Sequence, residues 1–307
     1  MSTLIENKMF FTISRPPTLV EWLEDVDVSF YLKNAKGKSD IFTFWDRLPV
    51  TNAQRCLFSK FVSERDNIAA IQLVSYDFWF QHQIGKKTRN MIRKAHKEGV
   101  ETKVCVIDDG IIRRVEYVYN HSLPMRQGVP FGHYGEKFDQ IKKSLESNSK
   151  YFNKFIGAFY KDKMIGFTYL LFSKSNDSAV IGQILSIEEF WDKAPNNALI
   201  ARAVEVACSC KAKYLVYSKM HSTRETSENS LRDFKMRNGF KEMSAMRYYI
   251  ALSLKGKFVL RLRLQHGLME ALPRQLKDLL YSKNSGVVHL RLGFVRVFRS
   301  LGLGASS

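Results

Sequence analysis

The sequence has 307 residues, which allows one large domain or two smaller ones at about 100 to 200 residues per domain. Its composition, 45% hydrophobic and 25% charged, is ordinary for a globular protein and excludes a fibrous or wholly disordered chain. The 48 Lys and Arg residues outnumber the 30 Asp and Glu residues. The resulting formal charge of +18 favours an anionic partner, whether nucleic acid, a phospholipid surface or a phosphorylated small molecule.

Cysteine usage and hydropathy indicate a cytoplasmic protein. The cysteines show neither a disulfide framework nor a zinc spacing, so we expect reduced thiols and no metal site. The N-terminal segment lacks the charge and apolar pattern of a signal peptide, and no run approaches the roughly 20 apolar residues that span a bilayer. Peripheral contact at the inner face of the membrane stays open. The cysteines are Cys56, Cys105, Cys208 and Cys210.

The first 85 residues mix short apolar runs with turn signals. The spacing of apolar residues predicts a helix from Asn52 that includes Phe61 and Val62, followed by a buried strand over Ile68–Tyr76. Three aromatic residues then follow, and we interpret them as core because no second stacking platform accompanies them. They are Phe78, Trp79 and Phe80.

A strongly basic helix is predicted over Lys86–Gly99, with Gly99 as its C-terminal stop. Its cations recur at three-to-four spacing, which gathers several of them on one face. Arg89 and Arg93 are therefore candidates for contact with substrate phosphates, since guanidinium groups suit phosphate oxygens. A solvated helix surface explains the same pattern equally well.

A strand over Val100–Ile107 and a helix over Asp109–His121 come next. The Gly- and Pro-rich segment after them is predicted to be a loop, and loops of this kind often carry binding residues. Its candidates for substrate binding are Arg126, Gln127 and His133, although His133 alone is also typical of an exposed loop histidine.

From Asn153 the pattern predicts an antiparallel meander, with a turn at Lys161, Asp162 and Lys163 and a third strand beginning at Ser178. An amphipathic helix follows, with Pro195 in its first turn and Asn196 or Asn197 as its cap. A strand over Tyr214–Ser218, a short helix closed by Gly239 and a last strand over Phe240–Leu252 complete this part.

This order resembles the GNAT acyltransferase superfamily, specifically its FemAB-like branch of the acetyltransferase type. The resemblance rests on GAFYKDKMIGFTYLL, APNNALIARAVEVA, KYLVYS, and SLRDFKMRNGF followed by RYYIAL, and more weakly on KKTRNMIRKAHKEGVETKV. It covers most of residues 86–252. It implies an α/β fold with a mixed, mostly antiparallel central sheet flanked by helices, built as a partial N-terminal GNAT-like half and a complete C-terminal one.

The domains that we predict on this basis are three. Residues 1–120 would form the partial half with the basic helix 86–99, and residues 121–252 the GNAT acyltransferase domain. Residues 253–307 would be a basic, Leu-rich helical tail, for which packing across the main domain and contact with an anionic membrane surface are both open.

The resemblance also implies where a donor would bind. GNAT proteins set the pantetheine arm of acyl-CoA between two splayed strands, which here would be Ala179–Ile187 and Tyr214–Ser218. The pyrophosphate would meet the start of the following helix, at Asn196, Asn197 and Ala198. The usual phosphate loop contains glycine, whereas KAPNNA has none. Some FemAB-like proteins use aminoacyl-tRNA, so the donor stays open between the two.

Catalytic candidates follow from the same comparison. The Phe-Lys pair of the FemAB-like pattern falls on Phe234 and Lys235, and Lys235 is a plausible point charge for a phosphate or a developing oxyanion. Amide formation also needs a base and a proton donor, for which Glu188 or the adjacent Glu189, and Tyr217, are candidates. A solvated carboxylate and a half-buried strand tyrosine explain these residues equally well.

The leading hypothesis is an N-acyltransferase that moves an acyl group from acyl-CoA to a primary amine, such as an amino sugar of a cell-surface glycan precursor. The first alternative is an aminoacyl-tRNA-dependent transferase acting on a cell-wall precursor, which the positive charge favours. The second is a noncatalytic module that binds anionic polymers or a membrane surface. The expected partners are thus an anionic small-molecule donor, tRNA, or an anionic membrane surface reached through the tail.

Overall fold

The structure is a computed structural model that describes residues 3–8, 10–17, 27–45, 58–123, 125–126, 129–130, 132–147, 152–173, 177–220 and 228–267. The chain divides into two compact units. The first contains Met1–Asp66 and Ala245–Ser307, and the second contains Asn67–Ser244. Each boundary falls inside a strand, the first within β4 (Val62–Gln72) and the second within β12 (Lys241–Ala251).

These boundaries differ from the predicted ones at residues 120 and 252. Helix α6 (Asp109–Asn120) ends at the first of the predicted boundaries. Its residues Val115, Val118 and Tyr119 belong to the same buried core as Phe167 and Leu199, which lie beyond that boundary. A division at residue 120 would therefore cut through one continuous core.

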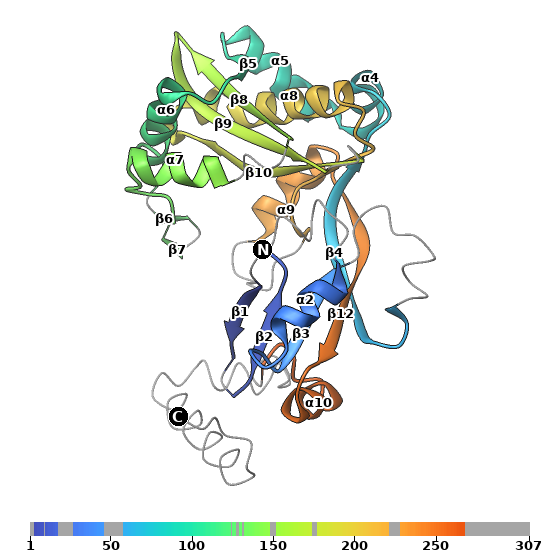
Figure 1. Ribbon diagram of the computed structural model, residues 1–307. Helices are drawn as coiled ribbons and strands as arrows, with labels where there is room; N and C mark the ends of the chain where they lie inside the picture. The colour runs from blue at the N-terminus through green and yellow to red at the C-terminus, as the bar shows by residue number, and fades with distance from the viewer. Residues whose placement is uncertain are drawn as a thin grey trace, which may run out of the picture. The chain divides into compact units, whose positions relative to one another are not determined.

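The first unit is built on three short strands with a helix on either side (Figure 1). Strand β2 pairs antiparallel with β1 and parallel with β3, and β3 pairs antiparallel with β12. Alternate residues of β3 enter two separate cores, Ile41 with α10, and Phe42 and Phe44 with α2. The elements are β1 (Leu4–Asn7), β2 (Thr12–Arg15), α2 (Val28–Ala35), β3 (Ile41–Trp45) and α10 (Leu254–Arg261).

The second unit contains a sheet with the strand order β4-β11-β10-β9-β8-β5. The β10–β11 pair is parallel and the other pairs are antiparallel, which confirms the predicted mixed, mostly antiparallel sheet flanked by helices. The meander turn at Lys161 and Asp162 is also as predicted, and both residues have positive φ. The strands are β5 (Glu101–Cys105), β8 (Phe152–Tyr160), β9 (Lys163–Phe172), β10 (Ser178–Ser186) and β11 (Tyr214–Val216).

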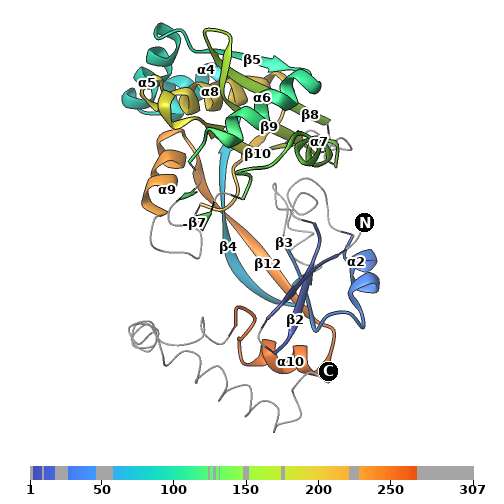
Figure 2. The same ribbon diagram turned by 90° about the vertical axis from the view of Figure 1, so that its left-hand side faces the viewer.

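Helices cover both faces of this sheet (Figure 2). Helix α8 packs against β8, β9 and β10 and also against α5, whereas α6 packs against β9 and α7. Side chains alternate along β9 accordingly, so that Phe167 meets Tyr119 of α6 edge to face. The helices are α4 (Tyr76–Phe78), α5 (Lys86–Lys97), α6, α7 (Phe138–Ser147), α8 (Pro195–Ser209) and α9 (Glu228–Arg237), with a π-helix η1 (Trp79–Gln83) and a 3-10 helix η2 (Glu188–Lys193).

Several expectations for the N-terminal part need correction. Most of the helix expected from Asn52 lies outside the described residues, but Val62 begins strand β4. That strand ends at Gln72, so Tyr76 belongs to α4 because Ser75 caps the helix by accepting from the amide of Phe78. Of the three aromatic residues, Trp79 is buried as predicted, whereas Phe78 is 41% exposed.

The basic helix and its stop are confirmed, since α5 ends just before Gly99, which has a φ of 85°. The loop after α6 is more ordered than expected. It contains a short hairpin, β6 (Met125–Arg126) and β7 (Val129–Pro130), and it leads into α7, which the sequence reading missed.

Three of the four cysteines lie among the described residues, and all three are free thiols. Within the described part of the chain, no helix combines the length and apolarity that a membrane crossing requires.

Candidate functional site

Strands β10 and β11 separate partway along the sheet, as the resemblance implied. They pair from Ser178 opposite Tyr214 to Val180 opposite Val216. Beyond this point β10 continues to Ser186 through an irregularity between Ile181 and Gln183. On the other strand, the amide of Tyr217 donates to Ala69 of β4 at 2.8 Å. The sheet therefore opens between two neighbouring strands, next to a bulge.

Gly182 lies in this bulge and is packed against Tyr169 of β9. A Cβ built at Gly182 would lie 2.0 Å from a ring carbon of Tyr169, so no larger residue fits without moving the ring. Bulges commonly occur beside binding and catalytic sites because they redirect a side chain. Here the bulge places Gln183 toward α6, where its side chain meets Tyr119.

A polar chain extends from the bulge on the α6 face. The hydroxyl of Tyr119 donates to Oε1 of Gln183 at 2.7 Å, and the Tyr119 ring stacks on His133 at 4.9 Å between centroids. His133 in turn contacts Oε1 of Glu136 through Nδ1 at 2.9 Å. Burial is the main cause that raises the pKa of Tyr119, so its hydroxyl stays protonated and acts as a donor. The structure thus connects His133 to the opening between β10 and β11.

Lys235 is the most perturbed cation near this opening. It is only 4% exposed, and its Nζ donates to the carbonyl of Lys219 at 2.5 Å. The ammonium also lies 4.7 Å from the ring centroid of Tyr217, the residue that follows β11. Burial lowers the pKa of Lys235 to about 8. The structure therefore brings the side chains of Lys235 and Tyr217 together.

The start of α8 differs from the predicted one in its cap residue. Its cap is Ala194, in the left-handed region with a φ of 54°, and no side chain caps the helix. The predicted caps Asn196 and Asn197 lie instead within the first turn. The amides of Asn197 and Ala198 donate back to the carbonyl of Ala194, at 3.1 and 3.3 Å.

The same helix end is also well covered. Ala194 and Ala198 are 5% and 1% exposed, and Pro195 has no N–H to offer. The side chain of Asn197 donates to Oδ1 of Asn238, at the end of α9, at 3.2 Å. Oδ1 of Asn196 in this turn and Oγ of Ser186 at the end of β10 are among the buried side-chain oxygens that have no hydrogen-bond partner in the described part of the chain.

The remaining candidates are scattered. Arg89 donates through Nη1 to the carbonyls of Phe80, Gln81 and Ile84, so it stabilises the chain before α5. Arg93 lies 5.5 Å from the Phe80 ring centroid. Phe234 is half-buried against the core, and Glu188 and Glu189 are exposed in η2. Arg126 is placed only as part of β6, and Gln127 lies outside the described residues.

Sequence reasoning missed Gln183, Tyr119 and Asn238. Asn238 is buried and donates to the carbonyl of Phe234, while its own carbonyl accepts from Trp79 Nε1 at 3.0 Å. In the sequence, the Asn238-Gly239 pair predicts a helix stop. A polar residue before such a stop also signals a possible buried hydrogen bond. Tyr119 and Gln183 carry no comparable signal, because their contact joins segments far apart in the chain.

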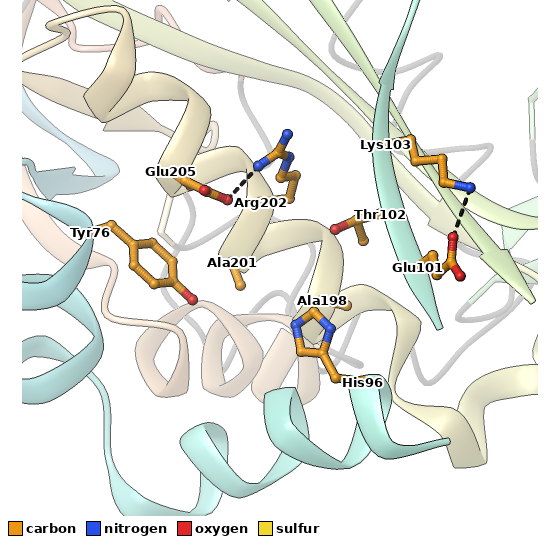
Figure 3. A pocket seen from close by; sticks show the side chains of 9 residues that line it. All are labelled: Tyr76, His96, Glu101, Thr102, Lys103, Ala198, Ala201, Arg202 and Glu205. Carbon is orange, nitrogen blue, oxygen red and sulfur yellow. Dashed lines mark hydrogen bonds and ion pairs between the residues drawn. The ribbon is translucent and has the colours of Figure 1, made fainter. Parts of the chain in front are cut away.

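A cavity of about 360 Å³ lies on another side of α8 (Figure 3). Ala198 and Ala201 leave room along its wall, and its charged side chains pair with each other, Arg202 with Glu205 and Lys103 with Glu101, each at 2.7 Å. These two ion pairs balance each other, but Nε of Arg202 is buried and has no hydrogen-bond partner among the described residues. The cavity is lined by Tyr76, His96, Glu101, Thr102, Lys103, Ala198, Ala201, Arg202 and Glu205.

No protein-family profile matches the sequence, and no curated protein is similar to it. Solved structures are nevertheless similar in fold. FemX has a TM-score of 0.58 at 10% identity, over 85% of this chain and 85% of that chain. The C-terminal domain of a protein assigned as a lysylphosphatidylglycerol synthetase of Agrobacterium fabrum has a TM-score of 0.55 at 11% identity, over 84% and 83%.

A third similar structure is L-PGS from Bacillus licheniformis, with a TM-score of 0.51 at 13% identity over 85% of each chain. At such identities the similarity shows the fold alone. The chain therefore has a GNAT-like fold of the FemAB-like kind.

Proposed function

We propose that this chain is a transferase that moves an acyl group, carried as an aminoacyl ester on tRNA, to a primary amine. The observation that carries the proposal is the buried Lys235 ammonium over Tyr217, at the point where β10 and β11 separate. A cation with few water neighbours can stabilise a developing oxyanion much more than a solvated one.

The chemistry needs no covalent intermediate. The amine nitrogen attacks the acyl carbonyl carbon, and the carbonyl oxygen takes negative charge that Lys235 stabilises. Collapse breaks the bond to the ribose oxygen, and the proton lost by the amine ends on that oxygen. Tyr217 is the proposed proton donor to the leaving oxygen, and Glu188 the proposed base for the amine.

The start of α8 is what favours tRNA over acyl-CoA as the donor. A CoA pyrophosphate is expected at exposed amides in the first turn of this helix. Here Pro195 has no N–H and the amide of Asn197 donates to Ala194, so the first turn offers fewer free amides than an exposed phosphate loop. The formal charge of +18, and the resemblance of the sequence to FemAB-like proteins, some of which use aminoacyl-tRNA, also support a tRNA-linked donor.

Acyl-CoA remains the rival donor, because the opening between β10 and β11 is where GNAT proteins hold pantetheine. Two titrations separate the donors. If tRNA is the donor, its affinity should fall steeply between 50 and 200 mM salt, by about 10³-fold or more for six or more phosphate contacts. Calorimetric binding of acetyl-CoA, with no measurable binding of charged tRNA, would instead establish the rival.

Catalysis is tested separately from binding. We expect Lys235→Ala to abolish transfer of a radiolabelled aminoacyl group to amine-bearing cell-wall precursors or amino sugars, and to leave the affinity for tRNA within about twofold. A wild-type chain that binds tRNA and transfers nothing to any amine would support the noncatalytic alternative. The proposed location is the cytoplasm, at the inner face of the membrane.

A further inference from the structure

Helix α10 is held in a fixed orientation in the first unit. Ser253 caps it, accepting from the amide of Gly256 at 3.0 Å and donating to Oδ1 of Asp40 at 2.6 Å. Gly256 packs directly on the backbone of Asp40, because a Cβ there would lie 2.0 Å from the Asp40 carbonyl oxygen. Val259 and Leu260 are buried on the same side. The opposite side of α10 therefore faces solvent.

That outward side is apolar in a helical pattern. Leu254 is 82% exposed, Phe258 is 36% exposed, and Leu262, just after the last turn, is 50% exposed. Residues four apart lie above one another on a helix, so these side chains form one stripe. Ordinary surface helices bury such a stripe and expose the polar side, whereas α10 has a second apolar face beyond the buried one.

Cations border the stripe. Lys257 and Arg261 are exposed and lie three and seven positions after Leu254, on the same side of the helix. Residues 253–267 contain no Asp or Glu. Among the described residues, the carboxylates that contact this segment are Asp40 and Glu64, and both are occupied. Asp40 lies 3.4 Å from Lys255 and accepts from Ser253, and Glu64 lies 2.8 Å from His266.

The segment that contains α10 is cationic as well. Residues 245–267 contain 5 Lys and Arg and no Asp or Glu. In the sequence, residues 268–307, outside the described part, contain 6 Lys and Arg against 2 Asp and Glu. The charge of this segment is thus complementary to an anionic surface.

We propose that the outward face of α10 docks on an anionic lipid bilayer. Leu254, Phe258 and Leu262 would enter the boundary between headgroups and acyl chains, while Lys257 and Arg261 would reach the anionic headgroups. This inference does not rest on the proposed function, because it concerns adsorption of the chain and not transfer.

The test is co-sedimentation of the full chain with vesicles of phosphatidylglycerol and phosphatidylcholine. We expect binding that rises with the phosphatidylglycerol fraction and falls at high salt. The double variant Lys257→Ala with Arg261→Ala should weaken partitioning on the order of tenfold or more, since each cation near an anionic surface contributes a factor of about five. Leu254→Asp with Phe258→Asp should weaken it further.

A matched control replaces exposed apolar residues of the second unit, Val74→Asp with Val106→Asp, which are 69% and 82% exposed and should leave binding unchanged. Circular dichroism and thermal melting establish that the variants are folded. The proposal is overturned if the wild-type chain does not bind these vesicles. It is also overturned if the α10 variants bind as the wild type does, or if they bind less only because they change the oligomeric state in sedimentation.

Discussion

The side chain of Asn197, in the first turn of α8, donates to the side chain of Asn238, at the end of α9, at 3.2 Å. Asn238 also donates to the carbonyl of Phe234 at 2.7 Å, and its backbone carbonyl accepts from Trp79. One buried amide thus holds the end of the helix that carries Lys235 against the start of α8. The position of the Lys235 ammonium depends on this contact.

Asn238→Ala should therefore destabilise the chain and also lower transfer. We expect the free energy of unfolding to fall by about 2 kcal/mol, because truncation leaves the Asn197 amide without its partner and removes one of the two donors to the Phe234 carbonyl, the other being the backbone amide of residue 238. Urea unfolding measures this loss. Asn34→Ala is a matched control, since Asn34 makes the same bond to the carbonyl four residues earlier but in an exposed helix. Its effect should stay within about 0.5 kcal/mol.

Substitution of Arg89 distinguishes a structural role of this side chain from a role in substrate binding. Arg89→Ala removes a cationic donor from three carbonyls, so it should lower the free energy of unfolding by about 1 to 3 kcal/mol. Arg93→Ala, which loses mainly a ring contact, should cost less than about 1 kcal/mol. Unchanged stability in Arg89→Ala, together with weaker donor binding, would instead favour the phosphate contact that the sequence suggested.

Lys235 should make stability depend on pH. Its pKa is lowered from 10.5 to about 8 in the folded chain, so between these pH values the unfolded chain binds the extra proton. The free energy of unfolding should therefore rise with pH from about 8 to 10.5, and the burial cost is fully present below pH 8. Lys235→Met should remove this rise with pH. It should also increase the free energy of unfolding at pH 7 by about 1 to 2 kcal/mol. This gain is smaller than the free energy that corresponds to the whole pKa shift, because the Lys219 carbonyl loses its donor. Transfer should be lost. If Lys235→Met instead lowers the free energy of unfolding at pH 7, then burial of the ammonium does not destabilise the folded chain.

Tyr119→Phe tests whether the bulge at Gly182 and Gln183 contributes to transfer. Removing the hydroxyl leaves Oε1 of Gln183 without this donor and should cost about 1 kcal/mol of stability. Because Gln183 lies in the bulge, transfer should also fall, mainly in kcat. Tyr117→Phe on the same helix is the control, since the Tyr117 ring, which this variant keeps, lies 4.8 Å from the ammonium of the exposed Lys163. Equal transfer by the two variants would place the bulge outside the reaction.

Gly256→Ala tests how tightly α10 is held. The added methyl would meet the Asp40 carbonyl oxygen at 2.0 Å, a backbone atom that can yield only by moving the strand or the helix. We expect a loss of about 2 to 3 kcal/mol in urea unfolding. Gly85→Ala, where no atom lies within 4 Å of an added Cβ, should be near neutral. A neutral Gly256→Ala would mean that α10 is not closely packed.

The sequence predicted most of the second unit because its elements have strong local signals. The meander from Asn153, helix α8 and the stop at Gly239 each follow from periodicity or turn chemistry within about fifteen residues. The site was harder, because its contacts join distant segments. Tyr119 reaches Gln183 across 64 positions, and Trp79 reaches Asn238 across 159. Patterns within a short stretch of sequence do not indicate contacts between residues so far apart in the chain.

A residue's local chemistry can suit more than one role. Asn196 and Asn197 are good caps by preference, yet Ala194 occupies the cap position because the chain enters α8 directly from η2. Arg89 fits a phosphate contact by composition, and in the structure its Nη1 donates to the carbonyl of Ile84. The phosphate contact of Arg89 stays a prediction.

The left-handed backbone at Ala194 has a consequence for engineering. Glycine adopts this conformation without strain, whereas alanine does so at a cost of about 1 kcal/mol, and here its methyl group is buried. The backbone at the start of α8 thus has a conformation suited to glycine, but the buried methyl group of Ala194 occupies the space that a glycine would leave open. Replacing Ala194 with glycine and Pro195 with a residue that carries an amide hydrogen would therefore give this turn more space and one further donor for a phosphate.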